Sequence, residues 1–497
     1  YDVFSVGNFY NRTDSDSRFV RHDSGTLGTD NFIAGNNAGD SITSGGNYNT
    51  VVGNEAGTAL TTGDNNVAVG FEALKTEDTG QNNVAVGYRA MNVANYNGSG
   101  NNVAVGADAG LSMTTGIFNT FVGALSGDAH TEGYNNVAIG TNALGSDVSS
   151  RATVAIGSSS LASQNNTNTD AYNTAVGFAS GSSVTTGVKN TLIGARAGDA
   201  LTIGENNVAI GWDALTADDV GSRNVAIGWD ALSSQNATGT TVNNFYNTAV
   251  GANAGAAITT GYYNTFMGGL AGDGTDDGLY NVAVGYLALS ANCGNSNTGI
   301  GTSALENTTG TNNTALGLDA GINVSSGSNN LCIGKDAGVT GSPGGNITSG
   351  SNEIALGDES IASFSCQVSL TATSDERDKT DFKDLDLGLD FVKALKPVTY
   401  VWDKRTNYVD KTDPDWRKTL DLDKITSDGS KKDDDLQVGF KAQDVIALEE
   451  AAGYKLSDKT NLTASITSDE KQYGLKYERF VPMLVKAVQE LSAKNDA

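Results

Sequence analysis

The feature that most constrains this chain is a glycine that returns at nearly regular intervals from position 35 to position 357. Eleven of the eighteen intervals are 17 residues long, and the others are 16 to 23. The glycines stand at positions 35, 53, 70, 87, 106, 123, 140, 157, 177, 194, 211, 228, 251, 268, 285, 301, 317, 334 and 357. A unit this short cannot bury a face alone, so it must be stabilised by stacking on its neighbours, as in a β-solenoid or β-roll.

Each unit reads N-[NVT]-A-[VI]-G-x-x-A-[GL] and continues with a polar stretch. Large and small residues alternate at Val208, Ala209 and Ile210, between an Asn and a Gly. β-branched residues in this setting predict a strand of about five residues, and one unit has room for about two strands and two turns. Insertions fall after the A-[GL] step and before the next Asn, so we expect them to form loops on one side of a stack of about 19 coils.

The alternation also separates two faces of each strand. Asn207, Ala209 and Gly211 share one face, while Val208 and Ile210 share the other. We expect Val and Ile to fill the interior of the coil. The small face then has two interpretations. It permits close approach of another chain around a three-fold axis, or it is small because a narrow coil has no room.

The composition changes at Ser374. Residues 1–373 contain 57 of the 62 glycines and 10 of the 31 Lys and Arg residues, whereas the last 124 residues contain 5 glycines and 21 Lys and Arg. We therefore predict a mainly β shaft at residues 31–366 and a small α+β domain at residues 367–497. Because the sequence begins at Tyr1 without a Met, residues 1–30 are expected to be a connector within a longer chain.

Composition and charge exclude several functions. The net charge of −26 argues against nucleic-acid binding, because no basic surface would replace the counterions of a phosphate backbone. No apolar run is long enough for a membrane span. Cys293, Cys332 and Cys366 are too far apart for a zinc site and are expected to be buried small residues, and His22 and His130 are too few for a histidine cluster. We predict no cofactor and no metal.

The repeat resembles the head of trimeric autotransporter adhesins, whose units read N-x-x-A-[IV]-G-x-x-[AS]. The resemblance covers about residues 31–357 and implies a trimeric left-handed parallel β-roll. It departs from the family in its longer repeat and in lacking the coiled-coil stalk and membrane anchor that follow the head.

The C-terminal sequence resembles the intramolecular chaperone of phage tailspikes and tail fibres, the endosialidase type also called peptidase S74. The signature S-D-x-R-x-K matches Ser374, Asp375, Arg377 and Lys379. Three further blocks match at residues 395–402, 438–445 and 477–491.

That resemblance implies both assembly and self-cleavage. The family's domain trimerises the fibre before it and then cuts itself off through a Ser–Lys pair. Ser374 would be the nucleophile and Lys379 the base that takes its proton, while Arg377 would hold Lys379 neutral or polarise the scissile carbonyl. Asp375 completes the signature. We predict scission beside Ser374, on a side that the sequence leaves open.

The last stretch has the spacing of a coiled-coil seam. Phe480, Leu484, Ala487 and Leu491 are 4, 3 and 4 residues apart, with Val481 and Val488 beside them. Three copies of the chain would close around this seam. Alternatively, the helix packs on the core of its own domain, and each interpretation can hold for different residues.

Together these features predict a phage tail fibre of the virion, extracellular and homotrimeric, that binds a glycan or protein receptor on the host. Other tail proteins would bind through the part of the chain before Tyr1. The insertions near 88–104, 158–174, 229–247 and 335–354 are candidate receptor contacts because they exceed the unit length.

The alternatives are a tailspike enzyme that degrades polysaccharide and a bacterial surface adhesin with the same chaperone. A glycosidase needs two carboxylates in one groove, whereas Glu55, Glu72, Glu132 and Asp213 are scattered over separate repeats. We therefore predict no turnover of an external substrate.

Overall fold

The computed structural model describes residues 20–22, 28–167, 169–236, 241–361, 363–367, 372–410, 420–467 and 469–496. Most of the predicted connector at residues 1–30 lies outside this description. The chain divides into two compact units, Tyr1–Ser296 and Asn297–Ala497. Each unit is described separately below.

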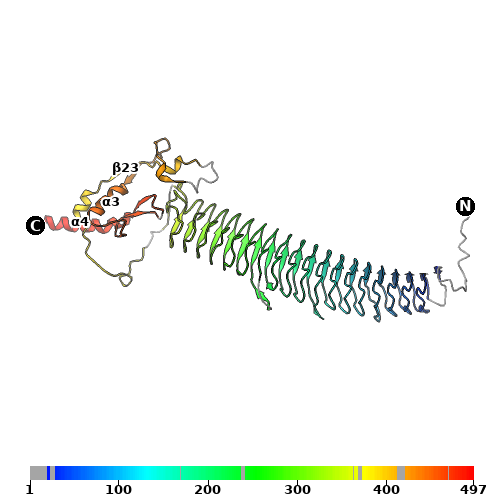
Figure 1. Cartoon of the computed structure of the whole chain (residues 1–497). Helices are drawn as coiled ribbons and strands as arrows, with labels where there is room; N and C mark the ends of the chain where they lie inside the picture. The colour runs from blue at the N-terminus through cyan, green and yellow to red at the C-terminus, as the bar shows by residue number, and fades with distance from the viewer. Residues whose placement is uncertain are drawn as a thin grey trace. The chain divides into compact units, whose positions relative to one another are not determined.

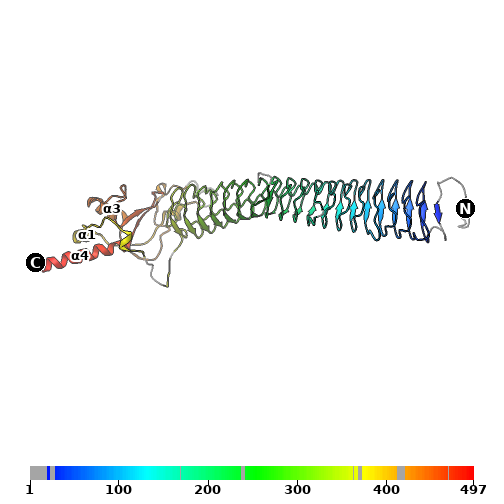
Figure 2. The same ribbon diagram turned by 90° about the horizontal axis from the view of Figure 1, so that it is seen from below.

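The first unit is a parallel β-solenoid (Figures 1 and 2). Each coil contributes one three-residue strand that pairs in register with the strand of the next coil, as where Ala209 lies beside Ala226. The predicted period and parallel stacking are confirmed, although the strands are shorter than five residues. The strands are β2 (Phe32–Ala34), β3 (Thr50–Val52), β4 (Val67–Val69), β5 (Val84–Val86), β6 (Val103–Val105), β7 (Thr120–Val122), β8 (Val137–Ile139), β9 (Val154–Ile156), β10 (Thr174–Val176), β11 (Thr191–Ile193), β12 (Val208–Ile210), β14 (Val225–Ile227), β16 (Thr248–Val250), β17 (Thr265–Met267) and β18 (Val282–Val284).

Three other strands of the first unit stand outside this ladder of coils. β1 (Val20–His22) pairs antiparallel with β2 at the N-terminal end. The short strands β13 (Gly221–Ser222) and β15 (Asn243–Asn244) pair with each other. Elsewhere in the described coils, the expected second strand is reduced to isolated bridges such as the one between Gln81 and Ser99.

The strand face that lies inside the coil is the opposite of the one that the sequence predicts. Ala209, at the centre of β12, is fully buried, whereas Val208 and Ile210 are only half-buried. The large interior side chain comes instead from the turn, where Leu215 is also fully buried. The coil is thin, so a small strand residue and one large turn residue fill it, and the β-branched residues point outward. The expectation that Val and Ile fill the interior was therefore wrong.

The Asn that opens each unit also lies inside, where it links three coils. The Asn207 side-chain oxygen accepts the Asn224 backbone N–H at 3.0 Å. Its amide nitrogen donates to the Gly221 carbonyl oxygen at 2.9 Å, and its backbone N–H donates to the Asn190 side chain at 3.0 Å. Asn207 is fully buried, so these bonds are made without competition from water. The placement of Asn on an outer small face was therefore also wrong.

The periodic glycine is required by the close stacking of coils. Gly211 has φ +140°, and a Cβ at this position would lie 2.3 Å from the Gly228 carbonyl oxygen of the next coil. Any side chain would collide with the neighbouring backbone, which explains why the glycine returns in each unit.

The second unit begins with coils of the same kind and continues into the C-terminal domain. Its coil strands are β19 (Thr298–Ile300), β20 (Thr314–Leu316), β21 (Leu331–Ile333) and β22 (Ile354–Leu356). The domain contains the 3₁₀ helices η2 (Glu376–Asp378), η3 (Arg405–Tyr408), η4 (Leu422–Lys424) and η5 (Tyr477–Arg479). Its α-helices are α1 (Leu389–Ala394), α3 (Ala442–Ala451) and α4 (Phe480–Asn495). Its strands form the antiparallel pairs β23 (Val398–Tyr400) with β24 (Gln437–Gly439), and β25 (Ala464–Ile466) with β26 (Tyr473–Leu475).

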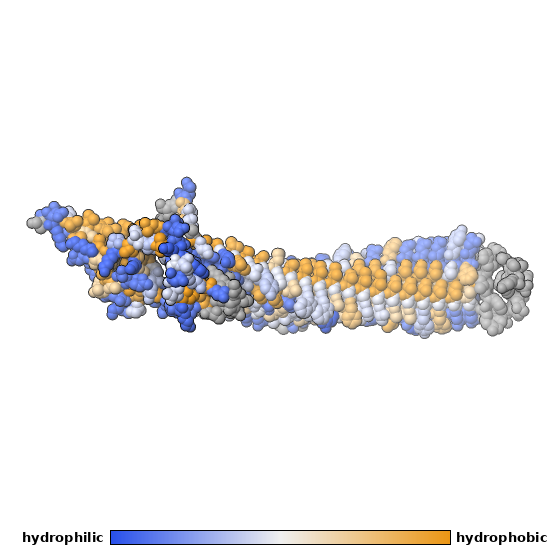
Figure 3. Space-filling model, turned by 90° about the horizontal axis from the view of Figure 1, so that it is seen from above, coloured by the Kyte–Doolittle hydropathy of each residue, from blue (hydrophilic) through white to orange (hydrophobic). Residues whose placement is uncertain are grey.

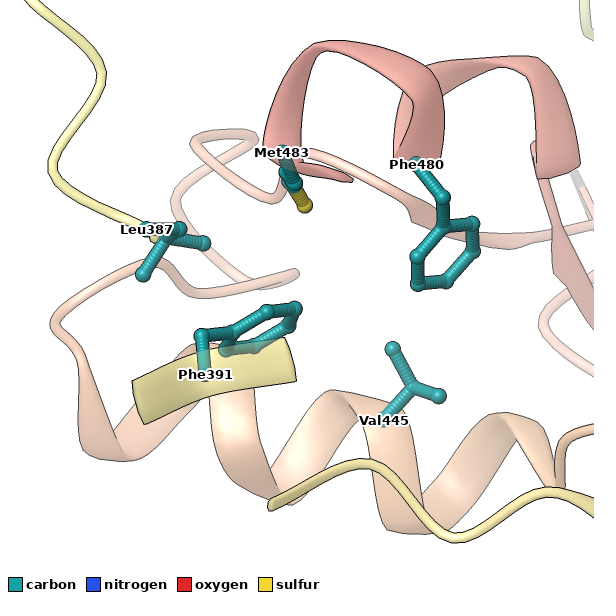
Figure 4. Close-up of a cluster of buried hydrophobic side chains, with 5 residues drawn as sticks. All are labelled: Leu387, Phe391, Val445, Phe480 and Met483. Atoms are coloured by element: carbon teal, nitrogen blue, oxygen red, sulfur yellow. The ribbon is translucent and has the colours of Figure 1, made fainter. Parts of the chain in front are cut away.

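The C-terminal domain has a small core made by distant parts of its sequence. Side chains from α1, α3 and α4 and from the segment before α1 converge in it (Figure 4). The buried members are Leu387, Phe391, Val445, Phe480 and Met483. None of the helices in the described parts of the chain is long and apolar enough to cross a membrane.

Helix α4 divides the predicted seam between two faces. Phe480 and Ala487 are buried in the domain, whereas Leu484 and Leu491 are about half exposed. Val481, Val485 and Val488 extend the exposed apolar face, with 53–66% of each side chain accessible. The helix therefore packs on its own core and also presents an apolar face.

Candidate active site

A single tight turn brings the predicted nucleophile and base together. Helix η2 follows Asp375, and Lys379 ends it by donating its backbone N–H to the Glu376 carbonyl oxygen at 3.1 Å. The Lys379 Nζ then lies 2.5 Å from the Ser374 Oγ and 3.2 Å from the Ser374 carbonyl oxygen. The amine and the hydroxyl are within the distance that direct proton transfer requires.

The other two signature residues pair with each other. Asp375 caps η2 by accepting the Arg377 backbone N–H at 2.9 Å. The Arg377 guanidinium also donates to this carboxylate, from Nε at 3.0 Å and from Nη2 at 2.6 Å. The hydrogen bond from the Arg377 side chain lowers the pKa of Asp375 below its usual value, and Asp375 in turn raises the pKa of Arg377. The expected action of Arg377 on Lys379 or on the scissile carbonyl stays a prediction.

The site lies at the surface of the single chain. Ser374, Arg377 and Lys379 are exposed, and Asp375 is half-buried. A lysine surrounded by water carries a proton and donates hydrogen bonds, whereas a general base must accept a proton. The predicted Ser–Lys chemistry would therefore require a second surface over Lys379, because burial favours a neutral amine.

Three of the four carboxylates considered for a glycosidase form ion pairs with basic side chains. Lys75 Nζ contacts Glu55 at 2.5 Å and Glu72 at 2.7 Å, so these two acids lie in adjacent coils against one lysine. Their separation of 17 residues, one repeat, is the sequence signal that places Glu55 and Glu72 at the same position of adjacent coils. Asp213 pairs with Arg196.

The cysteines differ in exposure. Cys293 and Cys332 are buried as expected, and burial raises the pKa of the Cys332 thiol to about 12. Cys366 is exposed, which corrects the expectation for this residue. Within the described ranges, no three His, Cys, Asp or Glu side chains gather where they could hold a metal.

One insertion proposed as a receptor contact lies against another part of its own chain. Gly345, in the insertion at 335–354, approaches the Thr467 side chain so closely that a Cβ there would lie 2.5 Å from it. The Asn346 backbone N–H donates to Asp469 at 3.1 Å. The C-terminal domain therefore partly covers this insertion.

Residues 374–454 match the family model described as the chaperone of endosialidase, Peptidase_S74. The match begins at Ser374 and includes Asp375, Arg377 and Lys379. It ends before α4, so the similar block at residues 477–491 lies beyond it. No curated protein and no solved structure matches the chain.

Proposed function

From a β-solenoid joined to a domain of the endosialidase chaperone family, which is the organisation of a tail-fibre-like protein, we propose that the chain is a phage tail fibre. It assembles as a homotrimer and attaches the virion to a receptor on the host surface. The C-terminal domain trimerises the chains and then cuts its own chain beside Ser374. The observation that carries this proposal is the 2.5 Å separation of Ser374 Oγ and Lys379 Nζ at the first residue of the family match.

Two exposed apolar surfaces support the trimer. Hydrophobic residues form a band along the stacked coils in the face shown in Figure 3. The outward strand residues of the first unit include Ile139, Ile193 and Met267, each 37–47% exposed. Such a row repeats once per coil, so a second copy of the same row matches it along its length. The exposed face of α4 offers a second contact in the C-terminal domain.

Assembly of three chains would also supply a surface over Lys379, which is exposed in the single chain. Coils of nearly equal length can pair out of register at little local cost, so a folded C-terminal trimer is needed to align three chains. The same association can cover Lys379 and favour its neutral form. Removal of the domain then leaves a fibre that is kinetically trapped in its trimeric state.

The substitution Ser374→Ala tests the cleavage. On a denaturing gel, the wild type is expected as two fragments and the variant as one full-length chain. Ser457→Ala, in the same domain but away from the signature, is the matched control and should be cut like the wild type. Equal size of the wild type and the Ser374→Ala product would refute self-cleavage.

The solution mass of the purified protein tests assembly separately. Light scattering on the uncut Ser374→Ala chain is expected to give three times the mass of one chain. A stable single chain would refute the trimer whatever the gel shows.

A further inference from the structure

The longest interval between repeat glycines in the second unit contains a loop that closes on itself. Ile347 donates its backbone N–H to the Gly338 carbonyl oxygen at 2.9 Å. Between them, the Ser342 Oγ accepts the Gly338 N–H and donates to the Gly345 carbonyl oxygen, both at 3.1 Å. Residues 338–347, here called the end loop, therefore fix their own shape through internal hydrogen bonds.

The end loop covers the last coil of the solenoid. Strand β22 is the last strand of the ladder in the described residues, and its central residue Ala355 is nevertheless only 1% exposed. A Cβ at Gly344 would lie 3.3 Å from the Ala355 Cβ, so the backbone of the loop lies directly against this residue. Val339 and Ile347 are also buried, at 1% and 0% exposure. The loop thus supplies the apolar cover that another coil would supply.

The contact between the end loop and the C-terminal domain is different in character. The Asn346 backbone N–H donates to Asp469, and Gly341 and Gly345 lie against carbon atoms of the Thr406 and Thr467 side chains. A cleft of about 250 Å³ separates Pro343 and Gly344 from residues of the β25–β26 hairpin. The loop is thus packed on the coil by buried apolar side chains, whereas its contacts with the domain include one hydrogen bond and two approaches of a glycine to a threonine side chain.

We propose that the end loop is a permanent cap that seals the C-terminal end of the solenoid by itself, and that the C-terminal domain rests on this cap and leaves it after the cut. A solenoid needs such a cap because its last coil otherwise exposes its interior and an unpaired strand edge. A cap formed by the domain would be lost on cleavage, whereas the end loop stays with the shaft. Only the departure of the domain rests on the proposed self-cleavage.

Hydrogen–deuterium exchange on the full chain tests the cap. Amides of β22 and of residues 338–347 are expected to exchange at equal rates, within about twofold, in the cleaved wild type and in the uncut Ser374→Ala chain. A rise of tenfold or more on cleavage would show that the domain seals the end, and would overturn the proposal.

Substitutions distinguish the contribution of the cap to the protection of β22 from the contribution of the C-terminal domain. In the Ser374→Ala background, Ile347→Asp places a charge in the buried cap and should raise exchange of β22 at least tenfold. Leu436→Asp is the matched control, because Leu436 is 71% exposed in the C-terminal domain and a charge there should leave β22 unchanged. Asp469→Ala removes the polar contact and should also leave β22 unchanged. Loss of β22 protection in Asp469→Ala, or its retention in Ile347→Asp, would overturn the proposal.

Size-exclusion chromatography of the cleaved wild type tests the departure of the domain. The two fragments are expected to elute separately, and co-elution would contradict this part. If the wild type is not cut, the proposed self-cleavage fails, but the Ile347→Asp comparison still tests the cap.

Discussion

The coils and the C-terminal domain are held together in different ways. A coil in the first unit is held to its neighbours through paired strands, the Asn ladder and buried large side chains. The C-terminal domain instead gathers five buried side chains from segments that are distant in sequence. A defect should therefore remain local in the solenoid and spread through the domain.

The largest effect is expected from removing one buried phenylalanine in each region. Phe121 is fully buried in a coil, and Phe480 is 6% exposed in the domain core. Truncation of either to Ala should cost about 3–5 kcal/mol. Phe121→Ala should raise hydrogen exchange only in nearby coils, whereas Phe480→Ala should raise it throughout the C-terminal domain and prevent cleavage. Exchange mapped by peptide checks both, and a global loss of protection with Phe121→Ala would remove the distinction.

A smaller effect is expected from breaking the Asn ladder. Asn207→Ala leaves the buried Asn224 N–H and Gly221 carbonyl without the partners they now have, which should cost about 2–4 kcal/mol. Asn95→Ala is the control, since Asn95 is exposed and the change should fall within about 0.5 kcal/mol. Denaturant midpoints of the coil transition measure the difference. Equal midpoints would mean that the ladder adds nothing to strand pairing.

Glu77 should make one coil sensitive to pH. Burial raises the pKa of this carboxyl above its usual value, so the folded state holds the proton more tightly than the unfolded chain. Stability is therefore lost as the pH rises from the ordinary carboxyl range through the raised value. Glu77→Gln should stabilise the protein at pH 7 by about 1 kcal/mol, as is typical of single substitutions, and the difference should vanish below pH 4. Thermal unfolding at the two pH values measures it, and an equal gain at both would contradict the titration.

The smallest effect on folding is expected at the exposed face of α4. Val488 is 66% exposed, so Val488→Asp should change the stability of the isolated fold by at most about 0.5 kcal/mol. In the proposed trimer the same change puts three like charges together and should lower the solution mass toward one chain. Ala487→Asp, at a buried neighbour, should instead unfold the domain. An unchanged trimer with Val488→Asp would exclude this face from the contact.

The sequence predicted the period and the parallel stacking, because a glycine that returns at nearly fixed spacing indicates coils stacked on one another. It did not predict which strand face is inside. The alternation of Val208, Ala209 and Ile210 separates two faces but does not orient them, and the usual preference for large residues inside fails in a thin coil. A further signal was available four positions beyond the repeat glycine. That position is Gly127, after Ser126, in the coil that has Phe121, and Leu215, after Ala214, in the coil that has Ala209, so one large side chain is exchanged for another in the same interior.

The candidate site was predictable in part. The signature identified Ser374 and Lys379, and the turn brings them together. The signature did not predict the pairing of Arg377 with Asp375. An exposed arginine can bind any of several nearby acceptors, and sequence spacing does not show which one it binds. The covering of the insertion at 335–354 depends on contacts between segments more than a hundred positions apart, such as Asn346 and Asp469.

Where adjacent coils carry the ladder Asn, they share the same upper and lower bonding pattern; Thr153 interrupts the ladder in one coil. The Asn207 backbone N–H donates to the Asn190 side-chain oxygen, and the Asn207 side-chain oxygen accepts the Asn224 backbone N–H. This hydrogen-bond pattern does not depend on the number of coils. A whole unit that carries it can therefore be duplicated or deleted without leaving a ladder donor or acceptor unpaired. The length of the solenoid is thus set by the number of units in the chain, and it can change by whole units while both ends keep their form.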